Sequence, residues 1–318
     1  MNRKNQFIQE MKKDDVINDV FVVKFKKPVE QYKNGYKFEL RLGDRTKEIM
    51  LKYWGPNDEQ VVQTLYDSIK KDEVVFVQGR VSEWNNNLEI ATNEHNEIKV
   101  LSSDEYSSED FVRVTEQDVD LMYSELKQII GLVKNSEIKS VLDYFFNDSE
   151  FEKKFKFSPA AMYVHHGWLG GLLEHSLSVV KLIVGLHKVH PNLDLDLLIA
   201  GAVLHDIGKL EEFEVKTSIR VSKKGMLLGH VSIGVDIVEK ACTSVGIADE
   251  LKMKLIHMII THMGEYGSSK TPSFPEAVAV YYCDQMDSRI TQIETLIKDA
   301  NTEDETIYHK DFGNVFLK

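Results

Sequence analysis

Histidines and carboxylates that could do chemistry are concentrated in one part of the chain. Nine of the eleven histidines lie between residues 165 and 262, where the hydrophobic pattern is helical. One of them, His205, is followed directly by Asp206 at the end of the apolar run LLIAGAVL. Histidine and aspartate are rarely buried unless they are paired, because burial of an unsatisfied polar group is costly. The pair is therefore either an ordinary helix end or part of a metal site.

Further residues of the same kind occupy other predicted helices. His175 lies on a helix expected to begin near Trp168, and His230 opens another in LLGHVSIG. His262 lies in LIHMIITHMG, and Asp284 stands inside the apolar VAVYYCDQM. Imidazole suits Mn, Fe, Co, Ni and Zn, and a carboxylate can bridge two ions. Separate helices can direct such ligands into one bundle interior; the alternative for each is a hydrogen-bonded core residue.

The first hundred residues show the period of strands instead. DVFVVKFKKP places Phe21, Val23 and Phe25 on one face and Val22, Lys24 and Lys26 on the other. NGYKFELRLGD and EIMLKYWG continue the alternation, and Asn34-Gly35 is a strong hairpin signal. A helix near 57–70 and two more strands, EVVFVQGRVSEW and NLEIATNEHNEIKVL, follow. This order resembles a five-stranded OB-fold barrel, with an expected interior of Phe21, Val23, Tyr36, Phe38, Ile49 and Leu51.

The opposite face of this barrel combines positive charge with aromatic rings, as a platform for single-stranded nucleic acid requires. The candidate nucleic-acid-binding residues are Lys24, Lys26, Lys37, Arg41, Lys52 and Trp54, with Trp84 near a loop. The alternative is a solvated sheet face whose lysines serve solubility and protect the sheet edge.

The change of period divides the chain into domains. We expect a barrel over residues 1–101, a linker over 102–112 with the polar, acidic SSDEYSSED, an all-α bundle over 113–300 and a tail over 301–318. One irregular stretch is expected near 212–228. The fold class is thus multidomain α and β, a five-stranded barrel followed by a helical bundle.

Composition limits the partners. The net charge is −12, yet residues 1–100 hold 17 basic and 17 acidic residues, whereas residues 101–318 hold 22 and 34. A polyanion must therefore be held by a local patch or through metal ions. No apolar run has the length of a membrane span, and the opening MNRKNQFIQEMKKDD lacks a secretory hydrophobic region. Two distant cysteines, Cys242 and Cys283, indicate free thiols and a cytoplasmic protein.

The order His175, His205-Asp206, Asp284 resembles the H…HD…D pattern of the HD superfamily of metal-dependent phosphohydrolases, and HDIGK is a frequent form of its centre. HHGWLGGLLEHSLSV, LHDIGKLEEF, LLGHVSIG and GEYGSSKTPSFPEAVAVYYCDQMDSR look like the corresponding segments of YhaM-type 3′-5′ exoribonucleases. Those enzymes place an OB-fold before an HD domain. The resemblance covers residues 12–300 approximately.

This resemblance implies a ligand set and a cofactor. His175, His205, Asp206 and Asp284 would surround one metal, and His230 and His262 would hold a second, with Asp206 bridging. The resemblance implies Mn²⁺, in one or two ions, with Fe, Co, Ni, Mg or Zn as alternatives. His257 precedes His262 by five residues, about 140° around a helix, so both cannot easily reach one ion. We favour His262.

The expected reaction is hydrolysis of single-stranded RNA, with DNA as an alternative substrate, to nucleoside 5′-monophosphates. The ions would hold the scissile phosphate and lower the pKa of a water that attacks phosphorus in line. Besides Asp206, the candidate catalytic residues are Lys209, for a phosphate oxygen, and His166, for the leaving oxygen or a phosphate. The alternative for Lys209 is a helix C-terminal lysine favoured by the helix dipole.

Two other functions stay open at this point. An HD site could equally hydrolyse cyclic nucleotides, cyclic dinucleotides or nucleoside triphosphates, although the barrel favours a polymer. A non-catalytic single-strand-binding protein is the second alternative. No membrane partner is expected, and a homo-oligomer is possible.

Overall fold

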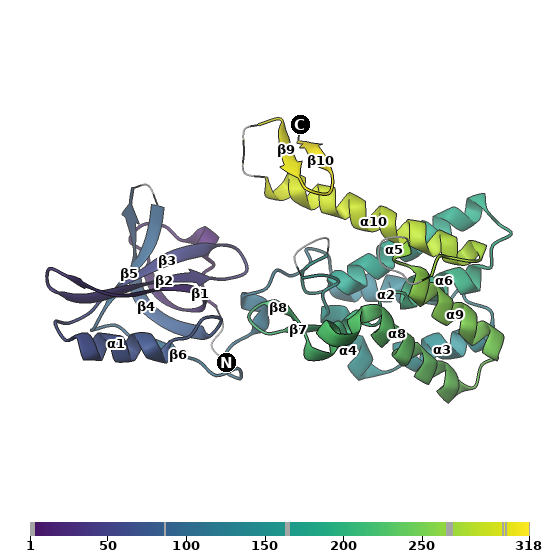
Figure 1. Ribbon diagram of the computed structural model, residues 1–318, viewed down its shortest axis with the longest axis horizontal. Helices are drawn as coiled ribbons and strands as arrows, with labels where there is room; N and C mark the ends of the chain where they lie inside the picture. The colour runs from purple at the N-terminus through teal and green to yellow at the C-terminus, as the bar shows by residue number, and fades with distance from the viewer. Residues whose placement is uncertain are drawn as a thin grey trace. The chain divides into compact units, whose positions relative to one another are not determined.

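The chain divides into two compact units. The computed structural model describes residues 4–85, 87–162, 166–264, 270–300, 302 and 304–317. One unit comprises residues 1–113 with the short segment 215–218, and the other comprises residues 114–214 and 219–318 (Figure 1). The segment predicted as a linker, 102–112, contains a short 3₁₀ helix, η2 (Ser108–Asp110), and the buried Phe111. The predicted domain boundaries stay predictions.

The first unit is a closed barrel preceded by a 3₁₀ helix, η1 (Ile8–Glu10). Its elements are β1 (Val16–Tyr32), β2 (Gly35–Gly43), β3 (Glu48–Trp54), α1 (Glu59–Ser68), β4 (Val74–Trp84), β5 (Asn87–Asn93) and β6 (Ile98–Val100). The strands pair in the order β1-β2-β3-β5-β4, and β4 pairs again with β1, which closes the sheet. Three strands, a helix and two strands in this order form an OB-fold barrel, as predicted. The predicted last strand is divided by a turn into β5 and β6.

The barrel core follows the alternation of the sequence. Phe21, Val23, Phe38, Ile49 and Leu51 are buried in one cluster, and Tyr36 packs against it half-buried. This confirms the predicted interior.

A β-bulge changes which side chains of β1 face outward. The register between β1 and β2 shifts between Val23 and Phe25, so that Phe25 pairs with Arg41 and Lys26 pairs with Leu40. One extra residue exchanges the two faces of a strand. Phe25 is consequently 53% exposed, and the prediction that it shares a face with Phe21 and Val23 is wrong. Lys26 lies on the inner side.

The inward turn of Lys26 gives its ammonium a structural role. It donates a hydrogen bond of 2.6 Å to the carbonyl oxygen of Tyr66 and a second to that of Ile69, at the carboxyl end of α1. Positive charge is favoured at this end of a helix. The predicted outward position of Lys26 is therefore wrong, because the bulge was not visible in the sequence.

The second unit is mainly helical, as predicted (Figure 1). Its helices are α2 (Val119–Ile130), α3 (Ser136–Phe146), α4 (Ser149–Phe157), α5 (Gly171–Val189), α6 (Leu195–Leu204), α7 (Lys209–Glu212), α8 (Lys223–Val245), α9 (Asp249–Thr261) and α10 (Pro275–Asp299). The predicted irregular stretch contains a hairpin of β7 (Phe213–Val215) and β8 (Ile219–Val221). The predicted tail forms another, β9 (Thr306–His309) with β10 (Gly313–Phe316).

Helix α6 explains how the His-Asp pair is positioned. Every residue from Leu197 to Leu204 is buried, so the helix is apolar on all sides and sits inside the bundle. The pair follows its last residue and therefore projects from a rigid element. Within the described part of the chain, no helix combines the length and apolarity needed to cross a membrane.

Candidate functional site

The His205-Asp206 pair lies in the interior of the helical unit. Both side chains are buried, and the N–H of His205 still donates to the carbonyl oxygen of Gly201, 2.9 Å away, which extends α6 by one residue. Its ring Nδ1 lies 2.8 Å from the carbonyl oxygen of Ala202. A carbonyl oxygen only accepts, so the proton is on Nδ1 and the lone pair is on Nε2.

A first cluster of ligand atoms forms around that Nε2 atom. Nε2 of His175, from α5, lies 3.1 Å from Nε2 of His205 and 3.2 Å from Oδ1 of Asp284, from α10. Oδ2 of Asp206 lies 3.5 Å from the same atom of His175. The four residues assigned to the first metal by resemblance thus converge.

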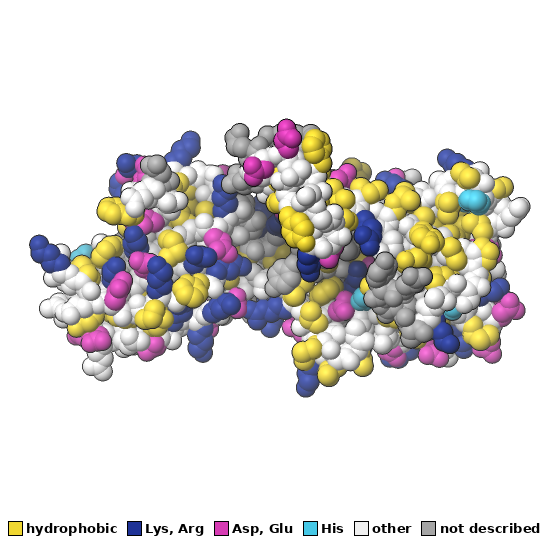
Figure 2. Space-filling view, turned by 45° about the horizontal axis from the view of Figure 1, so that its top comes forward, with side chains coloured by type: hydrophobic (Ala, Val, Ile, Leu, Met, Phe, Trp, Pro, Cys, Tyr) yellow, Lys and Arg dark blue, Asp and Glu magenta, His cyan; other side chains and the backbone are white. Residues whose placement is uncertain are grey.

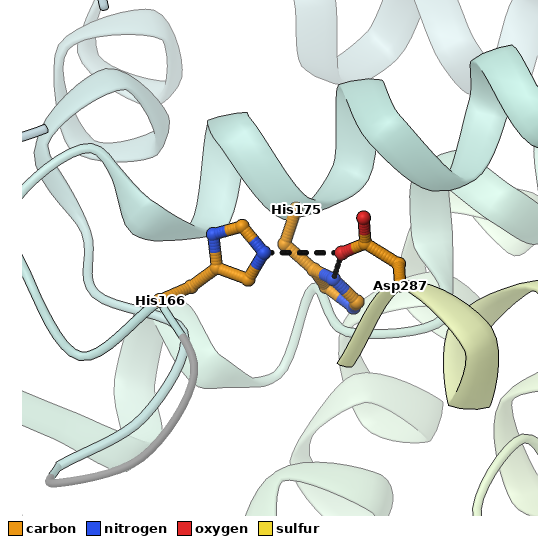
Figure 3. A group of neighbouring side chains, drawn as sticks. All are labelled: His166, His175 and Asp287. Atoms are coloured by element: carbon orange, nitrogen blue, oxygen red, sulfur yellow. Dashed lines mark hydrogen bonds and ion pairs between the residues drawn. The ribbon is translucent and has the colours of Figure 1, made fainter. Parts of the chain in front are cut away.

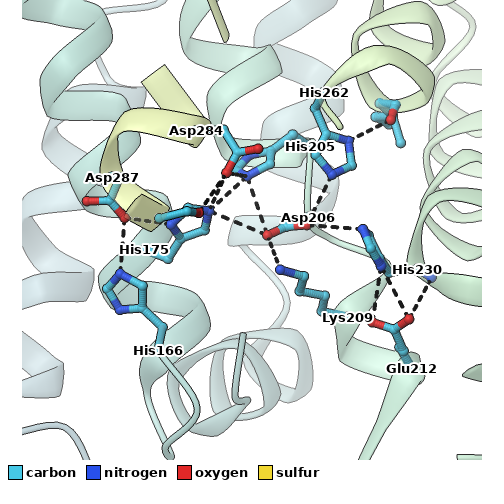
Figure 4. A network of polar contacts seen from close by, with 12 residues as sticks. His166, His175, His205, Asp206, Lys209, Glu212, His230, His262, Asp284 and Asp287 are labelled. Carbon is cyan, nitrogen blue, oxygen red and sulfur yellow. Dashed lines mark hydrogen bonds and ion pairs between the residues drawn. The ribbon is translucent and has the colours of Figure 1, made fainter. Parts of the chain in front are cut away.

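A second cluster lies on the other side of Asp206 (Figure 4). Oδ1 of Asp206 is 3.4 Å from Nε2 of His262 and 3.7 Å from Nε2 of His230. All three atoms are buried, and none has a hydrogen-bond partner among the described residues. The two oxygens of Asp206 therefore face different clusters, which suits a carboxylate placed between two ions.

The four candidate ligand histidines are all held through the other ring nitrogen. Nδ1 of His262 lies 2.7 Å from the carbonyl oxygen of Ile259, and Nδ1 of His230 lies 3.2 Å from the carboxylate of Glu212. Nδ1 of His175 lies 2.7 Å from Oδ2 of Asp287. Acceptors at Nδ1 orient each ring so that its Nε2 faces the other ligand atoms of its cluster, the usual arrangement around a metal. The residues present therefore fit one or two divalent ions.

The charged groups of the site shift one another's pKa values. Burial would raise the pKa of Asp206, but Lys209, His205 and His262 together outweigh burial and hold that pKa well below its usual range. Burial likewise opposes protonation of His175, but Asp284 and Asp287 outweigh it and raise the pKa of His175 to about 9. Burial lowers the pKa of His262. Asp206, Asp284 and His175 therefore favour positive charge in the first cluster, whereas burial disfavours a proton on His262.

Lys209 contributes positive charge beside Asp206. It is the first residue of α7, and its ammonium lies 2.6 Å from Oδ2 of Asp206. Lys209 is not the C-terminal lysine of α6, because α6 ends at Leu204 and a new helix, α7, starts at residue 209.

His166 reaches the site through a residue that the sequence did not single out (Figure 3). Its Nε2 lies 3.0 Å from Oδ2 of Asp287, the oxygen that also faces His175. Burial lowers the pKa of His166. The only local signal for Asp287 is its position three residues after Asp284, one turn along α10. Glu212 has no such signal, because only the tertiary fold brings it to His230.

His257 lies apart from both clusters. Its Nε2 accepts a hydrogen bond of 3.0 Å from the N–H of Ser273, and its ring packs against Phe274. The structure thus places His262 beside Asp206 and His257 elsewhere.

The outer face of the barrel brings four predicted residues together. Lys37 pairs with Trp54 across β2 and β3, with its ammonium 5.3 Å from the ring centre. The ammonium of Lys52 lies 5.9 Å from the ring of Trp84, which is 65% exposed. Arg41 lies on the same face of β2, because Lys37, Glu39 and Arg41 are alternate residues of that strand.

This outer face is not uniformly basic. Lys37 pairs with Glu30 at 2.9 Å, Lys52 with Glu89 at 2.6 Å, and Arg41 with Glu48 at 3.8 Å. Figure 2 shows acidic and basic side chains interspersed over the barrel unit, at the left of the view. Lys24, at the bulge, lies over Gly43.

The helical unit belongs to a class recognisable from its sequence. The HD domain model matches residues 172–289, which contain both clusters. A barrel followed by an HD domain with buried His and Asp clusters is the architecture that fold and site define.

Curated relatives match about four fifths of the chain. The chain is 31% identical over 263 residues to the 3′-5′ exoribonuclease YhaM of Shouchella clausii (strain KSM-K16), covering 81% of this chain and 79% of the relative. It is 30% identical over 268 residues to YhaM of Bacillus subtilis (strain 168), covering 83% and 82%. The chain therefore belongs to the YhaM 3′-5′ exoribonuclease family. The OB domain of Ta0387 from Thermoplasma acidophilum matches 30% of this chain and 86% of that chain at 13% identity and a TM-score of 0.25. The barrel assignment rests on the strand order instead.

Proposed function

We propose that this protein is a divalent-metal-dependent 3′-5′ exoribonuclease that releases nucleoside 5′-monophosphates from single-stranded RNA. One observation carries the proposal: in a chain of this family, Oδ1 of Asp206 and the Nε2 atoms of His230 and His262 converge, buried and without hydrogen bonds among the described residues. Three acceptor atoms in such a position are unfavourable unless a cation satisfies them.

The candidate ligands are His175, His205, Asp206 and Asp284 for one ion, with Asp206, His230 and His262 for the other. Mn²⁺ is proposed on the family resemblance, since the donor set alone also suits Fe, Co, Ni or Zn. A divalent ion bound here supplies Lewis acidity toward a phosphoryl oxygen and toward water.

The other catalytic roles fall to two side chains. The ammonium of Lys209 stands at Asp206, where it can hold a non-bridging oxygen of the scissile phosphate. His166 is held by Asp287 beside the first cluster and is the candidate to donate a proton to the leaving 3′ oxygen.

The barrel is proposed to hold the upstream strand. Trp54 and Trp84 offer rings for base stacking, and Lys37, Lys52 and Arg41 offer charge for phosphates. Lys24 is the weaker candidate because it lies over Gly43. Single-stranded RNA is the proposed partner and DNA the alternative. The cytoplasmic location is also a proposal, supported by two buried cysteines, Cys242 and Cys283, that form no disulfide in the described structure.

The test is incubation of end-labelled single-stranded RNA with Mn²⁺. The wild-type protein should release mononucleotides progressively from the 3′ end, and Asp206→Ala should abolish release while single-strand binding survives. Asp236→Ala, an exposed carboxylate of α8, is the control and should retain activity. Undiminished hydrolysis by Asp206→Ala would contradict the assignment. Faster turnover of cyclic or free nucleotides than of RNA would support the small-nucleotide alternative.

A further inference from the structure

Helix α8 is interrupted immediately before a candidate metal ligand. Gly229 has φ 68° and ψ 158°, in a region that side-chain-bearing residues rarely adopt, and His230 follows it. A Cβ at position 229 would meet no atom within 4 Å, so the requirement for glycine there is conformational and not a matter of space. The interruption changes what the N–H of His230 can reach.

The carboxylate of Glu212 is the acceptor for both the backbone N–H and the ring Nδ1 of His230. In a continuous helix the N–H of residue 230 would bond to the carbonyl oxygen of Met226. Here it donates to Oε1 of Glu212 at 3.1 Å, and ring Nδ1 lies 3.2 Å from the same carboxylate. One carboxylate therefore fixes the backbone, the ring orientation and the tautomer of His230. Nε2 is left as an acceptor that faces Asp206 (Figure 4).

Glu212 is itself held in place by close packing. A Cβ on Gly225 would collide with the backbone of Glu212, so the two chain segments approach as closely as only a glycine allows. The carbonyl oxygen of Glu212 also accepts a hydrogen bond of 2.8 Å from the N–H of Ser222. The neighbouring Glu211 faces Lys224 instead and makes an ion pair with it.

His230 depends on this contact more than His205 and His262 depend on theirs. His205 and His262 are each held by a carbonyl oxygen of their own helix, three residues earlier. The side chain of His230 is 17% exposed, whereas those of His205 and His262 are 1% exposed or less. Packing therefore immobilises His230 least, and an acceptor from another element immobilises it instead.

We propose that Glu212 is the positioning residue of the second metal subsite, formed by Asp206, His230 and His262, and that it makes this subsite separable from the first. The proposal rests on the metal centre of the proposed function. His175 is oriented by Asp287 and His205 by the carbonyl oxygen of Ala202, so we expect the first subsite to survive the loss of Glu212. Removal of such an orienting acceptor typically weakens metal binding about 10- to 100-fold.

The experiment measures Mn²⁺ itself on the full-length, metal-depleted chain. Equilibrium dialysis with Mn²⁺ gives stoichiometry and affinity, and electron paramagnetic resonance distinguishes a coupled ion pair from an isolated ion. We expect two ions and a coupled signal for the wild type. Glu212→Ala should retain one tightly bound ion with an uncoupled signal, and the second should bind about 10- to 100-fold more weakly. Glu212→Gln, which keeps an acceptor oxygen, should be intermediate.

Glu211→Ala is the matched control and should behave as the wild type. Two ions bound with unchanged affinity by Glu212→Ala would overturn the proposal, and so would loss of both ions together from a folded variant. Circular dichroism reports folding, and if Glu212→Ala fails to fold, Glu212→Gln decides by the same criteria. A wild-type protein that binds no Mn²⁺ would instead overturn the metal centre, and this inference with it.

Discussion

Oδ1 of Asp206 and Nε2 of His262 lie 3.4 Å apart in the interior of the helical unit, and neither forms a hydrogen bond with any described residue. His262 presents a lone pair at this atom, because its other ring nitrogen donates to the carbonyl oxygen of Ile259. Two acceptors thus face each other with no donor to either atom among the described residues, which is costly in a protein interior. A shared cation would resolve the conflict.

Removal of metal should therefore destabilise the protein. We expect Mn²⁺ at 100 times its dissociation constant to stabilise the metal-depleted protein by about 2.7 kcal/mol, because the folded state alone has the site. Calorimetry with and without Mn²⁺ measures this as a rise in Tm. Asp206→Ala should abolish the rise, whereas Asp236→Ala should keep it. A Tm independent of Mn²⁺ in the wild type would contradict a tight metal centre.

The metal-free protein should also respond to pH through His175. Its pKa is raised from 6.5 to about 9 in the folded state, since Asp284 and Asp287 outweigh burial. The stabilisation from its protonation is fully present below pH 6.5 and is lost as the pH rises through about 9. Mn²⁺ must displace this proton, so its affinity should rise over the same range. Thermal unfolding with a chelator, and Mn²⁺ titrations between pH 6.5 and 9, measure the two trends. A flat profile in both would contradict the expectation.

Replacement of Lys209 should separate chemistry from metal binding. A hydrogen bond to a charged group contributes about 1.5–3 kcal/mol, so Lys209→Ala should lower kcat/KM roughly 10- to 100-fold. The stoichiometry of Mn²⁺ should not change, because Lys209 offers no ligand to a cation. Steady-state hydrolysis of a short RNA and metal analysis give the two readings. Lys224→Ala, an exposed lysine paired with Glu211, should leave kcat/KM unchanged; equal losses in the two variants would remove the proposed role.

The barrel face should determine affinity for long single strands. Base stacking on an aromatic ring is worth about 1–3 kcal/mol, so Trp54→Ala should weaken binding by that amount. Lys52→Ala should reduce the slope of log affinity against log salt by about 0.7 if this lysine neutralises one phosphate. Fluorescence anisotropy with a labelled oligonucleotide measures both effects. Lys70→Ala, beyond α1, is the control, and loss of affinity there equal to that of Lys52→Ala would argue against a defined face.

The sequence by itself determined the kinds of element and most of the candidate ligands. Alternation of apolar residues along β1 to β5 reports burial on one side of a sheet, and this local property predicted Phe38 and Leu51 in the interior. His205 stood out because it ends an apolar helix and Asp284 because it interrupts one, and an unpaired polar side chain would be costly at either place. Their grouping into one site came from the family resemblance.

Only the tertiary structure decided the contacts between elements. The bulge that turns Phe25 outward and Lys26 inward depends on the pairing of β1 with β2, and a strand's own period does not contain it. The contacts of Asp287 with His175 and of Glu212 with His230 could be recognised only in the folded structure, because Asp287 and Glu212 lie on other helices, α10 and α7. Periodicity reports which face of an element is buried. The residue that each buried side chain meets there follows from packing over long sequence separations.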